Sequence, residues 1–250
     1  MLKGFDGTRL RSILGVALVL GAASGILASI LSTVIAEPII DDAIALEESR
    51  ADPNAPPEPE LVARELQRGT GRFAAYALGG AAFGLLFGLT YALLRRSHTE
   101  PLRCAALTGA VLTGAITISP WLKYPPNPPA AGDPATLAER QQLYSLLILV
   151  SAVVLLGAIA LAGRLRAAHW AEHRRVAAVV IAGAIAMAAV FALFPPAPDA
   201  ACAPADLVWR FRVASLATNM VVWTGLALGF GVIAAGSHRK VAASVSPGRR

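Results

Sequence analysis

The chain has 250 residues, of which 56% are hydrophobic and 15% are charged, and its formal net charge is +6. This composition departs from that of soluble proteins in the direction expected for membrane-spanning chains, and no polar segment is long enough to fold as a separate domain. All 22 basic and 16 acidic residues lie outside six long apolar stretches, so the basic excess does not indicate nucleic-acid binding.

The six apolar stretches predict six transmembrane helices. Each stretch has 19 to 25 residues without a charged residue or a histidine. About 20 residues that rise about 1.5 Å each cross the hydrocarbon core, where only a helix satisfies its own backbone hydrogen bonds. We therefore expect an all-α, polytopic bundle in which residues 1–250 form a single integral membrane domain, with spans at residues 12–36, 73–94, 104–122, 143–163, 176–194 and 213–236.

The distribution of charge predicts how the bundle is oriented. The two termini and the segments after the second and fourth stretches hold 14 of the 22 basic residues but only 3 of the 16 acidic residues. By the positive-inside bias, both termini are cytoplasmic and the other three loops face outward. The first stretch exceeds the apolar core of a usual signal peptide, so we expect an uncleaved anchor; cleavage after Ala36 is the alternative.

The first outer loop, residues 37–72, combines a short helical pattern with a proline-rich linker at residues 51–59. In a helix, Glu37 and Asp41 would lie about 6 Å apart along the axis. Two carboxylates at this distance predict a site for a divalent cation, and the alternative is ordinary solvated surface charge. The linker composition is typical of an extended segment.

Polar residues inside the spans recur at helical spacing, so each set shares one face of its helix. In the predicted orientation these faces lie in the outer half of the bilayer and would line one polar vestibule. The alternative is that the hydroxyl groups bond to their own backbone or to neighbouring helices. The sets are Ser29, Thr33 and Glu37; Thr113 and Thr117; Arg140, Tyr144 and Ser151; and Arg212, Ser215 and Asn219. Small residues also recur one turn apart, at Gly21 with Gly25, at Gly80 with Gly84 and Gly88, and at Gly225 with Gly229, which predicts close helix packing.

The third loop and the start of the last span carry distinctive patterns. Paired prolines stiffen residues 123–134, and Asp133 followed by Pro134 predicts a helix cap before the fourth span. Trp209 is placed where interfacial aromatic residues belong, beside Arg210 and Arg212.

Four groups of residues form a pattern that runs along most of the chain. They are Glu37, Pro38, Ile40, Asp41, Ala43 and Ile44; Glu60, Leu61, Val62, Arg64, Gln67 and Arg68; Lys123, Tyr124, Pro125, Asn127, Pro128, Pro129, Gly132, Asp133 and Pro134; and Trp209, Arg210, Phe211, Arg212, Ala214 and Ser215. In this order they resemble the CbtA family of predicted cobalt transporter subunits.

The resemblance implies cobalt uptake for cobalamin synthesis, at the inner membrane of a bacterial cell. It also implies a small single-span partner, CbtB, that carries histidines. We expect no permanently bound cofactor, with Co²⁺ as the transported ion, and no catalytic site. The alternative function is a scaffold that transports nothing itself and stabilises its partner. His169 and His173, four residues apart, offer a further alternative, an exit-side metal site on one helix.

Overall fold

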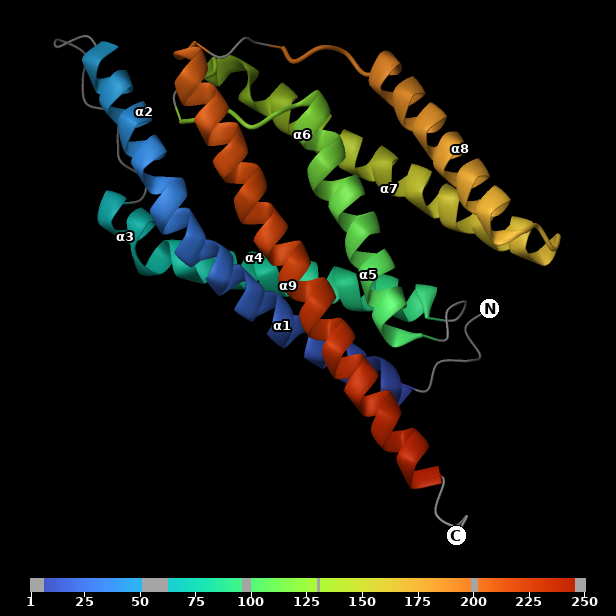
Figure 1. Ribbon diagram of the computed structural model, residues 1–250. Coiled ribbons are helices and arrows are strands. Elements are labelled where there is room, and N and C mark those ends of the chain that lie inside the picture. Colours follow the sequence, from blue (N-terminus) through green and yellow to red (C-terminus); the bar gives the residue numbers. More distant parts are fainter. Residues whose placement is uncertain (1–6, 51–62, 96–99, 130, 199–201, 246–250) are drawn as a thin grey trace. The chain divides into compact units, whose positions relative to one another are not determined.

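The computed structural model describes residues 7–50, 63–95, 100–129, 131–198 and 202–245, and most of these residues are helical (Figure 1). The predicted proline-rich linker at residues 51–59 lies outside them. The elements are α1 (Gly7–Ile35), α2 (Glu37–Arg50), α3 (Arg64–Arg68), α4 (Thr70–Leu94), α5 (Pro101–Leu112), the π-helix η1 (Thr113–Ile118), α6 (Ser119–Lys123), the 3-10 helix η2 (Pro134–Thr136), α7 (Leu137–Ala167), α8 (Glu172–Leu193) and α9 (Ala205–Val245).

The prediction of six membrane-spanning helices is confirmed. Within the described residues, six helical segments are long and apolar enough to cross a membrane: Arg9–Ile35, Thr70–Leu94, Pro101–Lys123, Pro134–Ala167, Glu172–Leu193 and Ala205–Gly236. The fourth begins well before the apolar stretch, as predicted, because the Asp133 side chain accepts a hydrogen bond from the Ala135 amide at 2.8 Å and Pro134 follows it.

The described chain forms two compact units, and α2, α5 and α9 contribute residues to both. Unit 1 comprises residues 1–38, 50–110 and 214–250, and unit 2 comprises residues 39–49 and 111–213.

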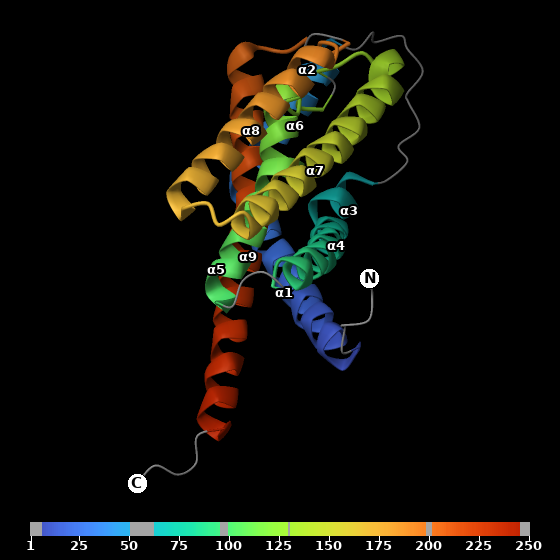
Figure 2. The same cartoon turned by 90° about the vertical axis from the view of Figure 1, so that its right-hand side faces the viewer.

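Unit 1 is built on the close crossing of α1 and α4, which both views show (Figures 1 and 2). A β-carbon on Gly21 would meet the carbonyl oxygen of Gly80, and one on Gly84 would meet that of Ala17. The predicted glycine faces therefore pack within this unit and bring two backbones into contact. On α9, Gly225 lies against the side chain of Ser24 of α1.

Aromatic side chains join α9 to α4 inside unit 1. The ring centroids of Phe83 and Trp223 lie 5.1 Å apart, and those of Tyr91 and Phe230 lie 4.6 Å apart in an edge-on arrangement. Trp223 is 1% exposed, so this contact forms the centre of the unit.

Unit 2 contains the antiparallel pair α7 and α8, which lie side by side in both views (Figures 1 and 2). Its α8 has no buried residue, and among the described spans it is the one whose apolar window is wholly uncovered. The π-helix η1, in the third span, places a wider turn beside α7, and the Ser119 hydroxyl donates to the Gly114 carbonyl oxygen at 2.8 Å.

The turn between α7 and α8 corrects the expectation that His169 and His173 lie on one helix. His169 has φ 57°, in the left-handed region that follows a helix end. Its amide donates to the Arg166 carbonyl at 3.0 Å, and the Trp170 amide donates to the Leu165 carbonyl at 3.1 Å. This pattern is a Schellman motif, so His169 terminates α7 while His173 lies in the first turn of α8.

Candidate functional site

Glu37 lies at the centre of an ion cluster in unit 1. Its side chain is 9% exposed, and three arginines from α3 and α4 surround its carboxylate. Arg64 Nη2 lies 2.7 Å and Arg68 Nε 3.1 Å from one oxygen, while Arg72 Nη1 lies 2.7 Å from the other. The cluster joins the start of α2 to α3 and to the start of α4 with charge-assisted hydrogen bonds.

Two carboxylates that share a cation need surroundings without competing positive charges, and the surroundings of Glu37 are different. A divalent cation at Glu37 would have to displace guanidinium groups, and three positive charges beside one negative charge repel it. Asp41 is half-buried on α2, and its neighbour Asp42 accepts from Arg210 Nη1 at 3.2 Å within unit 2. The structure thus brings arginines to Glu37, and a cation shared by Glu37 and Asp41 stays a prediction.

A series of polar groups follows the α1–α4 contact inward from this cluster. Arg72 Nη2 donates to the Thr33 hydroxyl at 2.8 Å, and the Tyr76 hydroxyl donates to the Ser32 hydroxyl at 3.2 Å. The Ser29 side chain is fully buried, and its hydroxyl has no hydrogen-bond partner among the described residues. The predicted residue Thr33 is therefore joined to Arg72, and its neighbour Ser32, which was not predicted, is joined to Tyr76.

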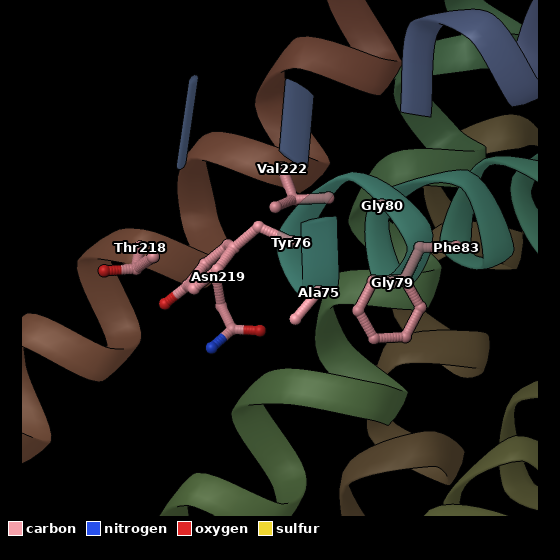
Figure 3. A pocket seen from close by; sticks show the side chains of 8 residues that line it. All are labelled: Ala75, Tyr76, Gly79, Gly80, Phe83, Thr218, Asn219 and Val222. Carbon is pink, nitrogen blue, oxygen red and sulfur yellow. The ribbon is translucent and has the colours of Figure 1, made fainter. Parts of the chain in front are cut away.

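Tyr76 also lines a cavity of about 320 Å³ between α4 and α9 of unit 1 (Figure 3). Figure 3 shows Tyr76 and Phe83 of α4 and Asn219 of α9 among the side chains that line this cavity. The Asn219 amide nitrogen donates to the Ser215 carbonyl at 2.9 Å, which fixes the side chain. Its amide oxygen accepts no hydrogen bond from the described residues, so this oxygen is available to a ligand.

The start of the proline-rich loop of unit 2 is hydrogen-bonded to the end of α8 and to the segment that follows it. Lys123 Nζ donates to the Phe191 carbonyl at 2.8 Å, and Phe191 lies in the last turn of α8, where carbonyls lack helical partners. The Tyr124 hydroxyl donates to the Pro195 carbonyl at 2.8 Å, and burial raises the pKa of this phenol. Tyr124 therefore stays protonated and keeps its role as a donor at neutral pH.

Arg212 connects the same loop to α9 inside unit 2. Its Nη2 donates to the Asn127 amide oxygen at 2.8 Å, and its Nε donates to the Pro126 carbonyl at 3.3 Å. Trp121 Nε1 donates to the Arg212 carbonyl at 3.0 Å, and the Trp121 and Trp209 ring centroids lie 6.5 Å apart. These motif residues hold the loop in place through a network of hydrogen bonds.

A second cavity, of about 440 Å³, lies in unit 2 and gathers two predicted vestibule residues, Arg140 and Tyr144, with two residues of the proline-rich loop. Tyr124, Asn127, Arg140 and Tyr144 all line it. Arg140 Nη2 donates to the Asp133 carbonyl at 3.2 Å, which orients the guanidinium group. Of the residues predicted to form one vestibule, Asn219 therefore lines the cavity of unit 1, whereas Arg140 and Tyr144 line the cavity of unit 2.

Sequence reasoning missed Arg72 and Tyr76 as members of the site. A signal was present, because Arg68, Arg72 and Tyr76 follow one another at intervals of four and would share a face of one helix. The significance of that spacing depends on Glu37, which lies more than 30 residues earlier in the chain, and spacing alone does not reveal such a contact.

Among the described residues, the six helices that are long and apolar enough to span the bilayer define the chain as a multi-pass membrane protein. It belongs to the CbtA family, described as probable cobalt transporter subunit, which matches residues 10–235. The match extends from the first span to the last and confirms the resemblance drawn from the loop motifs. The description names a transporter subunit and not an enzyme. Neither a curated protein nor a solved structure matches the chain.

Proposed function

We propose that this chain is a membrane subunit of a cobalt uptake system that supplies cobalamin synthesis. The observation that carries the proposal is the family match, which covers nearly all of the span-forming part of the chain. The predicted outer loops hold 13 of the 16 acidic residues, so they attract cations to the outer face before any ion enters the helices.

The cavity of unit 1 is the part of the structure that we assign to the cation. It offers the Asn219 amide oxygen and hydroxyl groups of Tyr76 and Thr218, and its described lining carries no positive charge. Hard and borderline divalent ions accept such neutral oxygen ligands together with water. Six water molecules occupy about 180 Å³ in the liquid, so a hydrated ion fits within the cavity volume of about 320 Å³.

Replacing Asn219 by leucine tests this route, because leucine keeps the bulk of the side chain and removes the amide. The matched control is Met220→Leu on the same helix, since Met220 is 37% exposed and does not line the cavity. In cells grown at low cobalt, N219L should lower cobalt accumulation about tenfold, as expected for one lost strong ligand, while M220L should leave it unchanged. Equal uptake by both variants, with equal membrane levels, would remove Asn219 from the route.

We further propose that the partner is a small single-span subunit of the CbtB type that supplies imidazole ligands. In this chain all four histidines lie in segments predicted to be cytoplasmic, at positions 98, 169, 173 and 238. Imidazole suits Co²⁺, so ligands of this type on the outer side would come from the partner. Uptake that requires co-expression of the partner supports this arrangement, and full uptake by this chain alone contradicts it.

A scaffold without transport activity is the second candidate, and the neutralisation of Glu37 by three arginines favours it. Liposomes that contain the purified chain with its partner separate the two functions. Cobalt entry above that of empty liposomes excludes the scaffold, whereas no entry with the partner present excludes transport by these two chains.

A further inference from the structure

The cavity of unit 2 has a chemistry that differs from that of the cation route. Its polar lining consists of one guanidinium group, two amides, two phenols and a hydroxyl, contributed by Arg140, Asn127, Gln141, Tyr124, Tyr144 and Ser145. None of its described lining residues carries a carboxylate. A permanent positive charge without a lining carboxylate disfavours a cation and attracts an oxyanion.

Neighbouring hydrogen bonds orient two of these groups as donors. The Asn127 amide oxygen already accepts from Arg212, so the amide NH₂ is the group that Asn127 offers to a ligand. The Arg140 guanidinium is positioned by its bond to the Asp133 carbonyl and has several N–H groups in a planar fork. A fork of this kind, with a second donor nearby, matches the tetrahedral oxygens of a phosphate group.

The remaining lining is apolar, and the cavity lies at the expected depth of lipid headgroups. Prolines 125, 126 and 198 and Leu137 form its walls, and Leu137 is 51% exposed. Arg140 precedes the apolar stretch that begins at Leu143 by three residues, or about 4.5 Å along the helix. The Trp121–Trp209 pair of the same unit is typical of this interfacial depth. A free phosphate ion would use none of the apolar wall.

From these observations we propose that the cavity of unit 2 binds the phosphodiester headgroup of a membrane phospholipid, with Arg140 and Asn127 as donors to the phosphate and the prolines and Leu137 against the glycerol region. Tyr124, Asn127, Arg140 and Tyr144 then serve lipid binding and the anchoring of unit 2, not the passage of the cation. The proposal is independent of which metal the protein transports.

The test uses the full chain, purified in mild detergent, and native mass spectrometry to count retained phospholipids. Arg140→Gln removes the charge and keeps a polar side chain. The matched control is Arg210→Gln, because Arg210 is an exposed arginine of unit 2 that does not line the cavity. We expect the wild type and R210Q to retain a phospholipid and R140Q to retain about tenfold less, which is the effect of losing one hydrogen bond to a charged group. Equal retention in all three, or equal loss from both variants, overturns the proposal.

A second measurement needs no variant and so does not depend on whether R140Q folds. After delipidation, the wild type is titrated with short-chain phosphatidylglycerol, with inorganic phosphate and with short-chain diacylglycerol, and thermal unfolding is followed. Saturable stabilisation by the phospholipid alone supports the proposal. Equal stabilisation by phosphate would identify a free oxyanion as the ligand, equal stabilisation by diacylglycerol would identify apolar binding only, and no stabilisation by any of the three would exclude the site.

Discussion

Glu37 has a different environment from the other acidic side chains of α2. Glu47 and Glu48 are exposed, whereas the Glu37 carboxylate is nearly buried among three arginines. Arg72 is itself only 10% exposed, so its charge depends on Glu37 for compensation. A buried carboxylate that balances several guanidinium groups is costly to remove, because the positive charges stay behind without their counter-ion.

Glu37→Gln should therefore destabilise the protein strongly. We expect a loss of about 3 kcal/mol, the lower part of the range for a broken buried ion pair, seen as a fall in unfolding temperature of about 10 °C in detergent for a chain of this size. Glu48→Gln on the same helix is the control and should change stability little. If Glu37 were instead a cation ligand without a structural role, E37Q would abolish cobalt uptake and leave the unfolding temperature unchanged.

His169 occupies a backbone position that favours glycine. Its φ of 57° lies in the left-handed region, which costs a residue with a β-carbon about 1 kcal/mol or more. His169→Gly should therefore raise stability by up to about 1 kcal/mol, while His173→Gly, in the first turn of α8, should lower it by a similar amount because glycine is a poor helix former. Thermal unfolding of the two variants checks the prediction, and a loss of stability in H169G contradicts it.

At the scale of helices, the contact between α1 and α4 shows why glycine spacing was informative. Lipid does not drive apolar helices together, so small residues at intervals of four are used where two backbones meet. The sequence predicted the faces but not the helices that they join. Gly21 and Gly25 meet α4, while Gly225 and Gly229 of α9 meet α1.

A single methyl group at this contact should separate the two helices. Gly21→Ala would place its β-carbon against the Gly80 carbonyl oxygen and 2.8 Å from the Gly84 Cα, so we expect destabilisation of about 2 kcal/mol, typical of overpacking. Gly15→Ala on the same helix meets nothing within 4 Å and should be neutral or slightly stabilising. Matched thermal unfolding of the two variants measures the difference, and equal behaviour would mean that α1 and α4 do not pack this closely.

The helices could be predicted because hydropathy and the length of an apolar stretch are properties of the local sequence. The contacts between side chains that are distant in the sequence could not be predicted in this way. Asp133 could be recognised as a cap from its neighbour Pro134, and the structure confirms it. Arg212 was expected to face a vestibule, but its guanidinium holds Asn127 and Pro126, a contact across about 85 residues of sequence. Spacing within one helix gives the face on which a residue lies, whereas its partner depends on how the helices pack.

At the scale of the whole molecule, function depends on which face of the membrane each loop occupies. The proposal places the acidic loops outside, where they concentrate cations, and the arginine-rich segments inside, where anionic lipids attract them. If the orientation were reversed, the cation would meet the basic segments first and would be repelled. This orientation is predicted from the positive-inside bias, which describes how a chain inserts into the membrane and not how its helices pack.

A native cysteine provides a direct measurement of this orientation. Cys202 is exposed and precedes α9 in a segment predicted to face outward, whereas Cys104 is buried. A membrane-impermeant maleimide should therefore label intact cells through Cys202, and Cys202→Ser should abolish the labelling. In a C202S background, Arg174→Cys, in the segment after the fourth span, should react only after the membrane is permeabilised. Labelling of Cys202 only in permeabilised cells would reverse the orientation and with it the direction in which the acidic loops collect the ion.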